Sequence, residues 1–141
     1  GDLLGLIDAD AAAFKPLAAA YGLPKDTPEQ KQAKEEALQA ALRDACLVPL
    51  RIMEVCCVVL SEARFMAENG SKLAVSDAGA SALLARAAAE AASLNVFINT
   101  GAMADRELAA SFEKQADELI ERANAEAELV GALVIGAIRK A

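Results

Sequence analysis

The chain has 141 residues, the length of one domain, and 55% of them are hydrophobic although only 4% are aromatic. The net charge of −7, with Lys and Arg scattered along the chain, argues against a nucleic-acid or anionic-membrane partner. No window reaches the roughly 18 uninterrupted apolar residues of a membrane span, and the acidic start lacks the basic region of a signal peptide. Much of the apolar content is alanine, which favours closely packed helices. We therefore expect one soluble, cytoplasmic domain over residues 1–141.

The first predicted helix runs from about Asp2 to Tyr21. Pro16 lies inside it, so we expect a kink or a break just before this residue. Gly22 is expected to follow the helix in the left-handed conformation, and Pro24 comes soon after to stop it.

The second helix is predicted to begin with a capping box. Thr27 is the cap, Pro28 takes the first helical position, and Gln30 completes the box. Pro49 is expected to divide this helix from a third one over about 50–68, because proline removes a helical hydrogen bond. Asn69-Gly70 is expected to end that third helix.

The fourth predicted helix is Ser76–Asn99, with Ser76 as N-cap and Asp77 in the first turn, where the helix dipole favours a carboxylate. Several side chains fall near one stripe of this helix: Asp77, Ser81, Leu84, Ala88, Ala92, Asn95 and Asn99. Small residues with polar groups at both ends suit hydrogen bonding between packed helices. They equally suit a cleft that binds a polar ligand, and the sequence leaves both interpretations open.

The last helix is predicted from about Arg106 to the C-terminus, with Asp105 as a candidate N-cap. Its second half, Ala123–Ile138, is apolar on more than one face and should be buried. In so small a domain a second subunit can provide that cover. Together the segments predict an all-α, up-and-down bundle of about five helices that packs as a homodimer.

The nucleophiles and metal ligands are few. Cys46, Cys56 and Cys57 are odd in number and lack Cys-x-x-Cys spacing, which favours small buried side chains without disulfides. Histidine is absent, so the usual metal ligand and the usual general base near neutral pH are missing. Asp8 and Asp10 flank one residue on a helix and point in different directions, as surface charges often do. Any acid–base chemistry must use carboxylates, Lys, Tyr, Cys or water, and we expect no metal.

Short motifs in a particular order give a more specific indication. They are IDADAAAF at Ile7–Phe14, LPK at Leu23–Lys25, VPL at Val48–Leu50, NG at Asn69–Gly70, SDAG at Ser76–Gly79, LNVFIN at Leu94–Asn99, and Asp105. The ordered set resembles the formiminotransferase-cyclodeaminase C-terminal (cyclodeaminase/cyclohydrolase) family. The resemblance spans nearly the whole chain.

The resemblance implies an all-helical, dimeric enzyme of one-carbon folate metabolism. One branch of the family converts 5-formiminotetrahydrofolate to 5,10-methenyltetrahydrofolate with loss of ammonia, and members outside the bifunctional enzyme are often methenyltetrahydrofolate cyclohydrolases. Neither reaction needs a metal or an organic cofactor, and a formiminotransferase is a possible partner. From the chemistry we expect Asp10 or Asp77 to handle the proton, while Ser76, Asn95 and Asn99 contact the folate substrate.

The extent of the chain and its exact activity remain open. Family members usually begin with a Gly-rich segment of the type PxPGGGS and an apolar helix before the part that matches Asp2, and the 141 residues contain no match to it. We therefore expect either a fragment of a longer protein or a truncated member. We expect a cyclodeaminase first, with a cyclohydrolase or a non-catalytic helical dimer of the same family as the alternatives.

Overall fold

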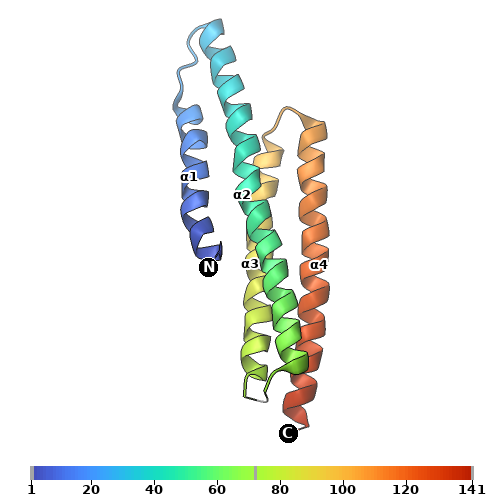
Figure 1. Cartoon of the computed structure of the whole chain (residues 1–141). Coiled ribbons are helices and arrows are strands. Elements are labelled where there is room, and N and C mark those ends of the chain that lie inside the picture. Colours follow the sequence, from blue (N-terminus) through green and yellow to red (C-terminus); the bar gives the residue numbers. More distant parts are fainter. Residues whose placement is uncertain (1, 72, 141) are drawn as a thin grey trace.

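The structure is a computed structural model that describes residues 2–71 and 73–140. Within these residues it is all-helical, with α1 (Asp2–Gly22), α2 (Pro28–Asn69), α3 (Val75–Gly101) and α4 (Arg106–Arg139). Successive helices run up and down, as predicted (Figure 1). The helices α2, α3 and α4 pack side by side, whereas α1 packs on α2 alone, beside its first half.

The expectation of about five helices is wrong, because α2 continues through Pro49 as one helix of 42 residues. The buried face of α2 passes through the proline without interruption, from Leu42 to Met53. The backbone carbonyl of Ala45, which would normally bond to the N–H of residue 49, instead accepts a hydrogen bond from Nδ2 of Asn99 at 3.1 Å. Packing and this replacement bond keep the helix continuous.

The helix α1 also contains its proline, Pro16, without a break. Residue 12, four positions earlier, is exposed, so water can supply the donor that the proline lacks. The left-handed conformation expected at Gly22 is wrong as well. Gly22 is the last helical residue of α1, and no described glycine has a positive φ.

Two of the three predicted caps are confirmed. The amide of Gln30 donates to Thr27 Oγ1 at 3.3 Å while the amide of Thr27 donates to Gln30 Oε1 at 3.2 Å, which is the capping box of α2. Asp105 caps α4 by accepting from the amide of Leu108 at 2.9 Å. The N-cap assignment of Ser76 is wrong, because α3 begins at Val75 and its cap position, residue 74, makes no side-chain bond.

The core consists of two apolar clusters along the bundle. The upper one joins all four helices, and the lower one joins α2, α3 and α4. Alanines allow the helices to approach closely, and a Cβ at Gly79 would lie only 3.0 Å from Cγ1 of Val134. Cys46, Cys56 and Cys57 are buried and free, which confirms the prediction of small core side chains without disulfides.

The outer surface of α3 is unusually apolar. Leu83, Leu84, Leu94 and Ile98 are between 61% and 72% exposed. By length and composition alone α3 could cross a membrane, a criterion that the core helix of a soluble protein also meets. The ion pair of Arg86 with Glu90, with Nε 3.1 Å from Oε1, lies midway along this helix.

Candidate functional site

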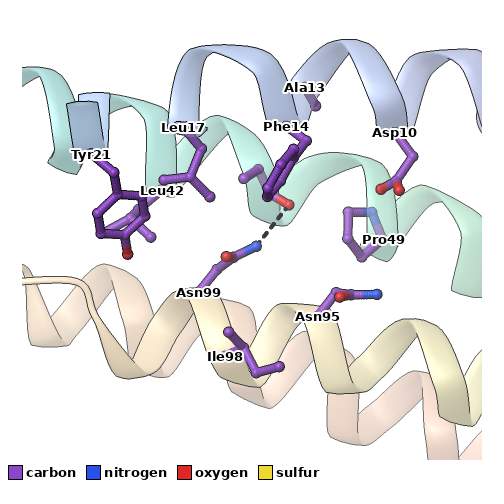
Figure 2. A pocket seen from close by; sticks show the side chains of 11 residues that line it. Asp10, Ala13, Phe14, Leu17, Tyr21, Leu42, Pro49, Asn95, Ile98 and Asn99 are labelled. Carbon is purple, nitrogen blue, oxygen red and sulfur yellow. Dashed lines mark hydrogen bonds between the residues drawn. The ribbon is translucent and has the colours of Figure 1, made fainter. Parts of the chain in front are cut away.

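A cleft of about 260 Å³ opens between α1, the first half of α2 and the second half of α3 (Figure 2). The side chains that line it come from three helices: Asp10, Ala13, Phe14, Leu17 and Tyr21 of α1, Leu42, Ala45 and Pro49 of α2, and Asn95, Ile98 and Asn99 of α3. Figure 2 shows Asp10 and Asn95 on opposite walls, with the Pro49 ring between them in this view.

The wall from α1 is one face of that helix. Asp10, Phe14, Leu17 and Tyr21 follow at spacings of three or four residues, so they lie on the same side. Leu17 is buried and anchors α1 against α2, whereas Phe14 and Tyr21 remain 63% and 55% exposed. The wall thus offers two aromatic rings and one carboxylate to the cleft.

The wall from α3 carries the two amides. Asn95 and Asn99 are one helical turn apart and therefore share a face. Nδ2 of Asn99 donates to the carbonyl of Ala45, and this is the one side-chain hydrogen bond of Asn99 among the described residues, so its Oδ1 accepts none there. Asn95 is exposed and makes no side-chain hydrogen bond within residues 2–71 and 73–140. The cleft therefore contains polar groups that a ligand can engage.

The end of α3 at this cleft is held by further polar contacts. Gln39 of α2 donates through Nε2 to the carbonyl of Ala102 at 3.2 Å and accepts through Oε1 from the amide of Ala104 at 2.7 Å. Arg106 donates through Nη1 to the carbonyl of Thr100 at 2.7 Å. The bonds of Gln39 hold the C-terminal end of α3 at one position along the axis of α2, and the bond of Arg106 joins α4 to the same end. Together they help to fix where the two amides lie.

The C-terminus of α1 is held to α2 in the same way. Nζ of Lys34 donates to the carbonyl oxygens of Tyr21 at 2.6 Å and Leu23 at 2.9 Å. A lysine at the C-terminal end of a helix also complements the helix dipole. Because α1 packs on α2 alone, this contact helps to set the angle at which Tyr21 meets the cleft.

The structure brings together Asp10, Asn95 and Asn99 but separates them from Asp77 and Ser76. Asp77 precedes Asn95 by 18 residues, which is about 27 Å along a helix. It lines a second cleft with Glu62 of α2, and Ser76 lines a groove between α3 and α4. The expectation that one site contains Asp77 together with the two asparagines is therefore wrong within one copy of the chain.

Sequence reasoning did not find the other contributors to the cleft, Phe14, Tyr21 and Pro49. The regular spacing of Phe14 and Tyr21 after Asp10 was a usable signal, since it places all three on one helix face. Pro49 gave no such signal, because its contact with the site depends on how α3 packs against α2.

The titratable groups of the cleft are few. Asp10 is the only carboxylate among the described residues that line it, and Tyr21 is the only phenol. Cys46 lies in the core on α2, where burial raises the pKa of its thiol to about 11 and keeps it protonated near neutral pH. Within residues 2–71 and 73–140, no group of three or more His, Cys, Asp and Glu side chains could hold a metal ion. Asp10 is thus the residue of this cleft best suited to accept and return a proton.

The residues that form this cleft lie within a recognised family pattern. The family model described as Formiminotransferase-cyclodeaminase matches residues 1–118, which include Asp10, Pro49, Asn95 and Asn99. The chain belongs to this family. The family resemblance of the sequence motifs is therefore confirmed.

Individual relatives agree with this assignment. A methenyltetrahydrofolate cyclohydrolase of Methylorubrum extorquens is 40% identical over 123 residues, covering 87% of this chain and 59% of that protein. The formimidoyltransferase-cyclodeaminase of Sus scrofa is 34% identical over 128 residues, covering 91% of this chain and 24% of that protein. The crystal structure of formiminotetrahydrofolate cyclodeaminase from Thermotoga maritima superposes with a TM-score of 0.81 at 25% identity, covering 96% of this chain and 64% of that one. The chain thus spans between about a quarter and two thirds of the length of these relatives.

Proposed function

We propose that this chain provides the substrate cleft of a folate one-carbon enzyme, formiminotetrahydrofolate cyclodeaminase. The observation that carries the proposal is the meeting of Asp10 with Asn95 and Asn99 in one cleft, from motifs 85 residues apart in the chain. Membership of the family and the names of the relatives support the substrate class.

The walls of the cleft suit a tetrahydrofolate ring system. Phe14 and Tyr21 offer aromatic surface, and the polar groups of Asp10, Asn95 and Asn99 can meet the polar edge of a heterocycle. The volume of about 260 Å³ lies just below the roughly 300–1,000 Å³ of most small-molecule sites. We therefore expect the cleft to hold the reacting part of the folate and to leave the remainder outside.

The proposed step joins two nitrogens of one substrate through one carbon. The second folate nitrogen attacks the carbon of the protonated formimino group (–CH=NH₂⁺) and forms the new C–N bond, while Asp10 accepts the proton that this nitrogen loses. Asp10 returns a proton to the formimino nitrogen, the bond from carbon to that nitrogen breaks, and ammonia leaves. Positioning both groups of one molecule can supply much of the rate, and proton transfer by Asp10 supplies the rest.

Methenyltetrahydrofolate cyclohydrolase activity is the second candidate, and the 40% identity with a protein of that name favours it. In that reaction water adds to the carbon of the methenyl cation while Asp10 accepts one of its protons. Asp10 returns this proton to one of the two ring nitrogens, the bond from carbon to that nitrogen breaks, and the hydroxyl proton passes to solvent as the formyl C=O bond forms. The same carboxylate and the same bound heterocycle serve both reactions. We expect either reaction to proceed without a metal or an organic cofactor, in the cytoplasm.

The test adds 5-formiminotetrahydrofolate to the protein and follows methenyltetrahydrofolate absorbance together with released ammonia. The proposal expects equal amounts of both products, and it expects Asp10→Asn to lower their rate of formation by about 10²-fold or more. A second sample receives 5,10-methenyltetrahydrofolate instead, and loss of its absorbance faster than in buffer, with no ammonia formed from 5-formiminotetrahydrofolate in the first sample, would support the cyclohydrolase. A folded protein that does neither would support the non-catalytic alternative.

We further propose that two copies of the chain associate through α3 and α4, and a formiminotransferase remains a possible additional partner. A groove of about 500 Å³ between these helices is lined by apolar side chains such as Leu83, Ile135 and Ile138. Val134 also lines the groove, but it is buried within one copy and belongs to the chain's own core. Leu83→Glu should therefore dissociate a dimer in sedimentation, whereas Leu73→Glu, at a position 91% exposed outside the groove, should not. A wild-type monomer at micromolar concentration would contradict the proposal.

A further inference from the structure

A proline in the middle of α2 accounts for the hydrogen bond that orients Asn99. Pro49 has no backbone N–H, so the carbonyl of Ala45, four residues earlier, lacks the donor that an α-helix normally supplies. Nδ2 of Asn99 lies 3.1 Å from this carbonyl oxygen and donates to it from α3. The dashed line in Figure 2 marks this bond.

This bond fixes which end of the Asn99 amide faces the ligand. A carbonyl oxygen can only accept, so the NH₂ group of Asn99 must face Ala45, and Oδ1 must face the other way. Because the side chain of Asn99 makes only the Nδ2 bond among the described residues and Asn99 lines the cleft, Oδ1 remains available as an acceptor. Asn95 has no such tether and can present either end of its amide.

We propose that Pro49 is a positioning residue, which leaves Ala45 without its helical donor and so holds Asn99 with Oδ1 ready to accept a hydrogen bond from an N–H group of the ligand. Asp10 adds a second acceptor from the facing wall. The cleft therefore favours a heterocycle with N–H donors along its edge. The tetrahydrofolate ring system meets this description, and its identity as the ligand rests on the proposed function.

The link between Pro49 and Asn99 can be tested by stability, without any ligand. Asn99→Ala should lower Tm by about 4 °C or more, because it leaves the buried carbonyl of Ala45 without a donor. In a Pro49→Ala background the new N–H of residue 49 bonds to that carbonyl, so adding Asn99→Ala should change Tm by less than about 1 °C. Equal effects of Asn99→Ala in the two backgrounds would overturn the proposal.

The positioning role is tested by affinity for tetrahydrofolate. Pro49→Ala and Asn99→Ala should each weaken binding about tenfold, and the double variant should bind no more weakly than Asn99→Ala alone. Pro16→Ala, which changes a proline of α1 that does not line this cleft, is the matched control and should bind as the wild type does. Unchanged affinity in Pro49→Ala would contradict the role. A wild type that binds no tetrahydrofolate would overturn the ligand and the proposed function together, while the stability cycle would still decide the link between Pro49 and Asn99.

Discussion

The two ends of α3 are held in different ways, although they belong to one helix. At the end that contains Asn99, this side chain donates to α2, and Gln39 of α2 exchanges two hydrogen bonds with the turn that follows α3. At the end that contains Asp77, the helix starts without a side-chain cap and packs through Gly79 against Val134. Hydrogen bonds specify direction as well as distance, whereas close apolar contact specifies distance only. We therefore expect an oriented ligand at the first end and helix packing at the second.

Matched carboxylate changes should give the largest contrast between these two ends. Asp10→Asn removes the proposed proton carrier and should lower kcat by about 10²-fold or more, in line with the loss of general acid–base catalysis. Asp10 is exposed, so Tm should change little. Asp77→Asn, at the other end, should leave kcat within about twofold, because no step is assigned to it. Turnover of 5-formiminotetrahydrofolate and a melting curve on both variants decide the matter. If Asp77→Asn lost more activity than Asp10→Asn, the active site would lie at the Asp77 end of α3, which would contradict the proposal.

Removing one polar side chain at each end should give the next largest contrast. Asn95→Ala should weaken folate affinity by about 1–3 kcal/mol, since it leaves a polar group of the ligand without its partner. Its fold should be unaffected, because Asn95 makes no hydrogen bond with the described residues. Ser81→Ala, in the cleft that contains Asp77, is the control and should bind folate normally. Calorimetric titration of both variants measures the difference, and equal affinities would remove Asn95 from the site.

A larger side chain at Gly79 should lower the stability of the fold and leave folate affinity unchanged, which is the opposite of the effect expected for Asn95→Ala. Gly79→Leu places atoms against Val134, where a single Cβ would already lie 3.0 Å from Cγ1. Overpacking of this kind costs about 1–3 kcal/mol of unfolding free energy. Affinity for tetrahydrofolate per folded molecule should not change. A urea unfolding curve and a binding titration on the same sample test both statements, and a loss of affinity at full folding would show that the two ends are coupled.

The smallest effect concerns Cys46, which lies in the core behind the cleft. Because burial raises the pKa of its thiol from 9.0 to about 11, the folded chain keeps a proton that the unfolded chain loses in this range. The stabilising contribution is complete below about pH 9 and is lost as the pH rises toward about 11. Cys46→Ala should therefore show a shallower fall of the urea midpoint across this range than the wild type. Its folate affinity at pH 7.5 should match that of the wild type; identical slopes in the two proteins would contradict the assignment.

The parts of the fold set by neighbouring residues were predictable. The capping box of Thr27 and Gln30 and the cap at Asp105 depend on side chains that reach backbone groups three residues away, so sequence spacing determines them. The continuity of α2 through Pro49 was not predictable. The donor that replaces the absent N–H of Pro49 belongs to Asn99, fifty residues later in the chain. Local rules predict that Pro49 lacks a hydrogen-bond donor, but only the packing of α3 on α2 brings in the side chain that replaces it.

The candidate site was predictable in its residue types but not in its grouping. Helical periodicity placed Asp77 near the same stripe as Asn95 and Asn99, and that stripe is longer than any one cleft. The carboxylate that meets the asparagines is Asp10, because α1 packs beside the first half of α2. Sequence spacing within one helix could not give this contact between helices.

The most direct test of the central claim is a crystal structure of this protein with bound 5,10-methenyltetrahydrofolate. We expect the heterocycle between α1 and α3, within hydrogen-bond distance of Asp10 and of Asn99 Oδ1, with Nδ2 of Asn99 still bonded to Ala45. A ligand found beside Asp77, or in the apolar groove between α3 and α4, would contradict it.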